Sequence, residues 1–231
     1  MANLNNISNK DYEYYQYIDY TFKNTVQKRA NGVLEFLEIP YTIDNIILSE
    51  IADTGPTMHR LDFAGESRKN GEKFCIILEC QSRLPTDEDI KRFFQYVSSL
   101  RILKNTKIEL YILCTENATY NIKEFVLNDE CIYKMHVLSL KHIKASKILK
   151  QIEYKITHEK ELSDRDIAAL ELIIYTDYED TKLEILQKTL NLVERLNIDA
   201  NEKEAIIYIL DVLSANMLKK QTKKHIWRKG T

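Results

Sequence analysis

A continuous apolar run that ends in a carboxylate limits the folds open to this chain. Residues 74–78 read Phe-Cys-Ile-Ile-Leu, and Glu79 follows directly. Consecutive apolar residues over such a short length are typical of a strand that is covered on both faces. We therefore expect residues 74–81 to form a central strand, with helices on both sides of the sheet and Glu79 near the strand's carboxyl end.

The remaining pattern places helices and strands around that central strand. The apolar spacing predicts a helix over residues 12–37, which ends before Pro40. Thr86, as an N-cap, and the acidic residues after it predict a helix that begins there and runs to about residue 103. A polar hairpin connection is expected over 66–72. The other predicted elements are strands at 43–51, 59–65, 107–114 and 131–140, and a helix at 141–153.

Beyond about residue 157 the pattern is helical only. Ser163 with Asp166, and Asp199 with Glu202, have the spacing of capping boxes. We expect three parts: an α/β core over residues 1–156, a helical C-terminal region over 157–218, and a basic, flexible tail over 219–231. That tail could also contact phosphates.

Composition excludes several classes of protein. A net charge of −2 and a pI of about 6.2 are not those of a protein that coats nucleic acid, although a local basic surface would suffice for an enzyme. The four cysteines form no C-x-x-C pair, which favours small buried side chains over a zinc site or disulfides. The sequence shows no signal peptide and no membrane-spanning run, so we expect a cytoplasmic protein without a membrane partner.

The residues that indicate chemistry are Asp62, Glu79 and Gln81. Side chains alternate along a strand, so Glu79 and Gln81 share a face, and a hairpin would bring Asp62 beside Glu79. Two adjacent carboxylates repel each other and favour a bound cation, for which oxygen ligands select Mg²⁺ or Mn²⁺. The alternative is structural: Asp62 caps a turn, and Glu79 pairs with Arg60 or Arg92.

This arrangement resembles a known family. Asp62 followed by Glu79-x-Gln81, on a hairpin that precedes a helix, is similar to the PD-(D/E)XK nuclease superfamily. More narrowly, the string that ends at Ser82, Leu-Glu-Cys-Gln-Ser, resembles the I-E-x-Q-S signature of the Rpn group, the recombination-promoting, transposase-like nucleases. The R-x-x-x-Y pattern of that group matches Arg92 and Tyr96, and its frequent basic residue before the Asp matches Arg60.

The resemblance implies a restriction-endonuclease-like core, with a mixed central sheet flanked by helices. Asp62, Glu79 and the backbone carbonyl of Cys80 would be the metal ligands. Gln81 stands where the superfamily has lysine; it can orient a water but carries no charge. The residue before Asp62 is leucine, where the superfamily name has proline.

Further residues could complete such a site. A third acid would come from Glu35, Glu38 or Glu50, of which we favour Glu50. Arg92 and Tyr96 lie one helical turn apart and would brace the site or contact phosphate. Arg60 and Ser82 are further candidates for substrate contact or support.

The implied function is Mg²⁺-dependent endonuclease cleavage of DNA phosphodiester bonds, linked to recombination or mobile elements. The alternatives are a catalytically weak or inactive module of the same fold, which binds nucleic acid or assembles, and a nuclease that cleaves RNA. Cutting both strands of a duplex needs two active sites, which favours a homodimer.

Overall fold

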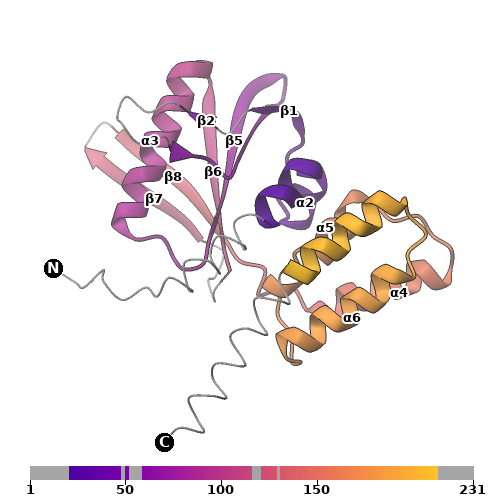
Figure 1. Cartoon of the computed structure of the whole chain (residues 1–231). Helices are drawn as coiled ribbons and strands as arrows, with labels where there is room; N and C mark the ends of the chain where they lie inside the picture. The colour runs from indigo at the N-terminus through magenta and orange to yellow at the C-terminus, as the bar shows by residue number, and fades with distance from the viewer. Residues whose placement is uncertain (1–20, 48–49, 52–58, 116–120, 129–130, 213–231) are drawn as a thin grey trace, which may run out of the picture.

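The chain has an α/β fold in which a mixed sheet is flanked by helices (Figure 1). The computed structural model describes residues 21–47, 50–51, 59–115, 121–128 and 131–212. The main sheet has six strands in the order β1-β4-β5-β6-β8-β7. Its strands are β1 (Ile43–Ile47), β4 (Phe63–Lys69), β5 (Glu72–Gln81), β6 (Lys107–Cys114), β7 (Asn121–Asn128) and β8 (Cys131–Leu138).

The sheet combines both strand directions. β5 pairs with β6 and β6 with β8 in parallel, whereas the β1–β4, β4–β5 and β7–β8 pairs are antiparallel. Two short strands, β2 (Glu50–Ile51) and β3 (His59–Arg60), form a separate antiparallel pair.

Helices cover both faces of the sheet. The described helices are residues 21–28, α2 (Ala30–Phe36), α3 (Asp87–Lys104), α4 (Ala145–Thr157), α5 (Asp164–Glu171), the 3-10 turn η1 (Ile173–Tyr175), α6 (Lys182–Glu194) and residues 200–212. α3 packs on one face, and α2 lies on the other with the C-terminal helices beyond it (Figure 1). None of these described helices combines the length and the apolar content that a membrane crossing requires.

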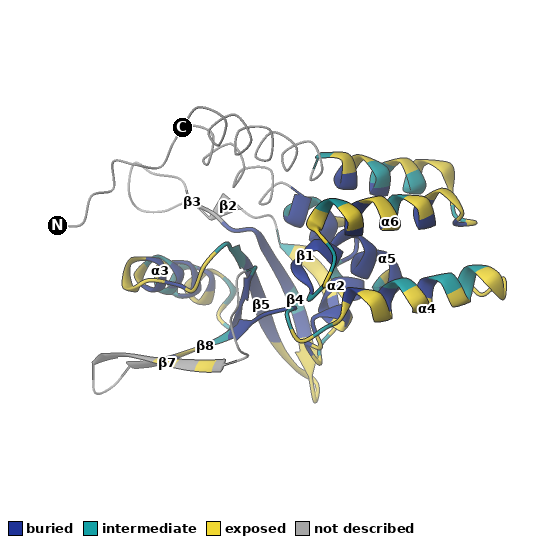
Figure 2. Cartoon of the chain, turned by 90° about the horizontal axis from the view of Figure 1, so that it is seen from below, coloured by how far each residue is buried: buried dark blue, intermediate teal, exposed yellow. Residues whose placement is uncertain are grey.

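The predicted central strand is confirmed. Ile76, Ile77 and Leu78 are fully buried, because Ile77 faces α3 while its two neighbours face the other helices. Figure 2 shows β4 and β5 buried over most of their length and exposed at their hairpin end, and it shows exposed surface on the outer sides of α4 and α6. The strand at Lys107–Cys114 and the Thr86 cap of α3, closed by Asp89 in a capping box, also match the prediction.

Three expectations about the strands were wrong in detail. The predicted connection over 66–72 is mostly strand, and the turn itself is Asn70–Gly71, with φ of 54° and 86°. Such left-handed pairs close two-residue hairpins whose twist matches that of the strands. The predicted strands at 43–51 and 59–65 are each divided into two. β7 was not predicted at all.

The predicted N-terminal helix differs from the structure in one respect. The part of the 12–37 helix that is described is interrupted at Arg29, and residues 12–20 lie outside the described part. The basic tail over 219–231 also lies outside it. α4 packs against α5 and α6, and one apolar cluster joins these helices to the sheet. The division of the chain near residue 157 therefore stays a prediction.

Arg29 holds three helical segments together. Its side chain is 8% exposed, and its Nε lies 3.5 Å from Oε1 of Glu171, a fully buried residue of α5. Its Nη1 lies 2.7 Å from Oε1 of Glu202 and 3.6 Å from Oδ1 of Asp164. Burial raises the pKa of Glu171, and the charge of Arg29 acts against that shift. Glu202, expected to complete a capping box with Asp199, instead pairs with Arg29, and Asp199 alone caps the helix.

We predict that Arg29→Met lowers the free energy of unfolding by about 3 kcal/mol, because it leaves the buried Glu171 carboxylate without its partner. The double variant R29M/E171M should recover most of that loss. Urea denaturation measures both. Arg165→Met, which removes the half-buried partner of the exposed Glu35, is the control and should change stability by less than about 0.5 kcal/mol. A double variant no more stable than Arg29→Met would contradict this account.

Gly32 gives a second test of the contact between α2 and α5. A Cβ on Gly32 would lie 2.5 Å from both the carbonyl carbon and the carbonyl oxygen of Asp164. We expect Gly32→Ala to cost about 2 kcal/mol, because the two helix backbones must separate. Gly71→Asn is the comparison, since open space surrounds Gly71 and asparagine tolerates its left-handed backbone. Equal losses in urea denaturation would count against a steric cause.

Candidate active site at the carboxyl end of the central strand

The β4–β5 hairpin brings Asp62 and Glu79 together. The antiparallel register pairs Phe63 with Leu78, so the next position along sets Asp62, in the bend before β4, opposite Glu79. Both side chains lie on the sheet face that packs against α3. Asp62 is 5% exposed and Glu79 is 3% exposed. The predicted juxtaposition is therefore present in the structure.

Each carboxylate accepts a hydrogen bond from the backbone of the opposite segment. The Asp62 N–H donates to Oε1 of Glu79 at 3.0 Å, and the Cys80 N–H donates to Oδ2 of Asp62 at 2.8 Å. These reciprocal bonds fix both side chains at one point, and each uses one oxygen of its carboxylate.

The electrostatics of the pair favour a cation. Burial raises the pKa of Glu79 well above its usual value, and the neighbouring Asp62 carboxylate raises it further. The Asp62 N–H and the charges of Arg92 and Lys23 act in the opposite direction. A positive charge near both carboxylates would stabilise their ionised forms.

The backbone carbonyl of Cys80 points to the same side as Asp62. Gln81 directs its carbonyl toward the end of β6, where it accepts from the N–H of Thr115 at 2.9 Å. Successive residues of a strand point their backbone groups to opposite edges, and the N–H and C=O of one residue share an edge. Because the Cys80 N–H bonds to Asp62, its carbonyl also faces that edge. The carbonyl that the sequence analysis named as a third ligand therefore faces the strand edge on which Asp62 lies.

Lys23 belongs to the site, and the sequence did not reveal it. Its Nζ lies 3.1 Å from Oδ1 of Asp62, and its side chain is 27% exposed. Lys23 comes from the helix at residues 21–28. It fell within the predicted N-terminal helix, but no local pattern distinguishes it from the other lysines. Only the three-dimensional packing places it at Asp62.

Arg92 and Tyr96 approach the site from α3. Tyr96 is buried, and burial, with the nearby Glu79 carboxylate, raises its pKa to about 12. Arg92 has an Nη2 3.3 Å from Oδ1 of Asp89, and its buried Nε has no hydrogen-bond partner. Its charge also lowers the pKa of Glu79. Both residues lie on the helix face toward the carboxylates, as the sequence spacing predicts.

Of the other residues predicted for the site, only some lie near the two carboxylates. Gln81 and Ser82 are half-buried at and just after the end of β5, with Gln81 on the same strand face as Glu79. The side chains of Glu50 and Arg60 lie outside the described part of the structure. The remaining two acids are exposed and lie beside other residues: Glu35 beside Arg165 and Glu38 beside His142.

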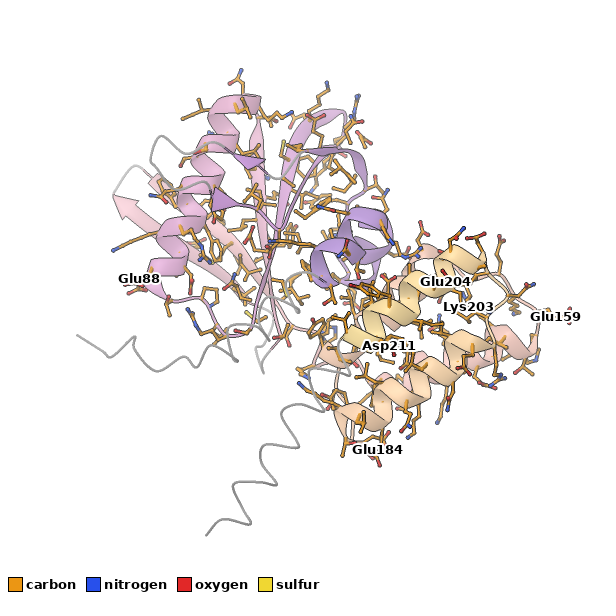
Figure 3. The ribbon with its side chains drawn as sticks, in the orientation of Figure 1. Glu88, Glu159, Glu184, Lys203, Glu204 and Asp211 are labelled. Carbon is orange, nitrogen blue, oxygen red and sulfur yellow. The ribbon has the colours of Figure 1, made fainter. Side chains whose placement is uncertain are left out.

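The donor set fits a hard cation better than zinc. Among the described residues there is no group of three or more His, Cys, Asp or Glu side chains that could hold a metal. Of the labelled acids in Figure 3, Glu88 and Glu184 are exposed on helices and Glu159 is exposed in the turn after α4, and all three lie away from the sheet. The site therefore offers two carboxylates and one backbone carbonyl. Mg²⁺ is typically held by one or two carboxylates and keeps its other positions for water and phosphate.

Comparisons of this chain with protein-family models, with curated proteins and with solved structures gave no match.

Proposed function

We propose that this chain is a metal-dependent endonuclease that hydrolyses DNA phosphodiester bonds, built on a restriction-endonuclease-like core and linked to recombination or mobile elements. The observation that carries the proposal is the buried Asp62–Glu79 pair, fixed by reciprocal backbone bonds beside Lys23 and Arg92. A sheet that needed only stability would not place two carboxylates together in its interior, because burying charges is costly.

Each residue has a role that follows from its chemistry. Asp62, Glu79 and the Cys80 carbonyl would hold Mg²⁺ or Mn²⁺, which polarises the phosphate and makes bound water more acidic. Gln81 can orient a water by hydrogen bonds. Arg92 carries a guanidinium suited to a phosphate oxygen, and Tyr96 remains protonated because its pKa is high.

A catalytically inactive module of the same fold is the second candidate. It is favoured by the Lys23–Asp62 ion pair, which already offsets one negative charge, and by the uncharged Gln81. The third candidate is a nuclease that uses the same residues to cleave RNA instead of DNA. A homodimer would be needed to cut both strands of a duplex in concert.

We predict that the protein nicks supercoiled plasmid DNA with Mg²⁺ or Mn²⁺ and that EDTA abolishes the reaction. Asp62→Ala and Glu79→Ala should each reduce the rate by at least about 100-fold, because each removes a ligand to the metal. Agarose gels and a parallel assay on structured RNA measure cleavage and substrate preference. Glu72→Ala is the matched control, since Glu72 is an exposed carboxylate of the same strand.

The outcomes separate the candidates. Nicking that survives in Asp62→Ala and Glu79→Ala would come from a contaminating nuclease and would overturn the proposal. DNA binding without any cleavage, in folded wild-type protein with either metal, would favour the inactive module.

Stability gives an independent test. We expect Glu79→Gln to abolish cleavage but to raise the free energy of unfolding in EDTA by about 1 kcal/mol. The amide oxygen can still accept from the Asp62 N–H, while the repulsion between two buried carboxylates is removed. Urea denaturation measures the change, with Glu72→Gln as the control. A loss of stability would indicate that the Glu79 charge serves the fold and not a cation site.

A further inference from the structure

Lys23 contacts the Asp62 oxygen other than the one that accepts from the Cys80 N–H. Oδ2 of Asp62 accepts from the Cys80 N–H at 2.8 Å, whereas Oδ1 lies 3.1 Å from the Lys23 ammonium. A cation held by Asp62 would use that same oxygen most easily. The ammonium therefore lies where a metal ion would compete with it.

The Lys23 side chain is also able to move away from Asp62. Its side chain is 27% exposed, while the Asp62 side chain that it contacts is 7% exposed. A lysine is a single point charge on a flexible stem, so it can move toward solvent while the buried carboxylates stay in place. It also cannot coordinate both carboxylates and the Cys80 carbonyl as a divalent ion can.

Lys23 brings to the site a positive charge that Gln81 does not have. Gln81 shares the strand face of Glu79 and can only hydrogen-bond. Lys23 supplies a mobile positive charge at the same point from a different segment of the chain. Arg92 is the other cation that acts on Glu79, but its Nη2 lies beside Asp89.

We infer that Lys23 occupies the cation position at Asp62 until a divalent metal displaces it, and that the displaced ammonium then pairs with a phosphate of the substrate. This inference rests on the proposed function, because it requires Asp62 and Glu79 to bind a metal. It assigns Lys23 two opposite effects: it weakens metal binding, and it promotes cleavage.

The test compares Lys23→Met with wild type by calorimetric titration with Mn²⁺ and by plasmid cleavage at saturating Mn²⁺. Lys23→Met should bind Mn²⁺ about fivefold more tightly, because a competing ion pair is gone. It should cleave at least about tenfold more slowly, because a charge that stabilises the phosphate is gone. Lys23→Gln should behave alike, and Lys23→Arg should stay near wild type in Mn²⁺ affinity.

Lys28→Met is the matched control, since Lys28 is an exposed lysine of the same helix, and it should leave both quantities unchanged. Unchanged or weaker Mn²⁺ binding by folded Lys23→Met would overturn the competition, and undiminished cleavage would overturn the phosphate contact. Wild-type protein that binds no Mn²⁺, or binds it equally after Asp62→Ala, would overturn the proposed metal site itself. Binding that Asp62→Ala abolishes but Lys23→Met leaves unchanged would overturn only the role of Lys23.

Discussion

The structure depends on one constraint, the reciprocal bonding of Asp62 and Glu79 across the β4–β5 hairpin. Each carboxylate accepts an N–H from the opposite segment, so the two residues and the hairpin register hold one another in place. A shift of one residue would turn Glu79 to the other face of the sheet, into the apolar cluster around Leu78. The geometry of the site therefore depends on the register in which the central strands pair, and each stabilises the other.

The helices on the two faces of the sheet determine the electrostatic environment of Asp62 and Glu79. α3 and the N-terminal helical segment exclude water from the carboxyl end of β5, and a less polar surrounding strengthens every charge interaction there. Each layer also brings one cation, Arg92 from α3 and Lys23 from residues 21–28. Burial and charge compensation come from the same elements, which is why the pair can be tolerated inside the sheet.

The sequence predicted the features that depend on local pattern. The apolar run before Glu79 indicated a strand buried on both faces, and Thr86 indicated the start of α3. It did not predict contacts between distant segments. The position of Lys23 depends on how the first helix packs, and the capping box expected for Glu202 was lost to a stronger ion pair with Arg29. These outcomes depend on tertiary contacts, which a local sequence pattern does not determine.

Charge balance connects the fold to the proposed chemistry. Asp62 and Glu79 would repel each other and oppose folding if no cation were near them, and a site that relied on metal alone would fold poorly without it. The Lys23 ammonium supplies a compensating charge from within the chain. If the site binds a metal as proposed, its hold on the metal would be weaker, because each ion would first have to displace the Lys23 ammonium. Such a site suits Mg²⁺, which proteins typically hold with few carboxylates and share with the phosphate of the substrate.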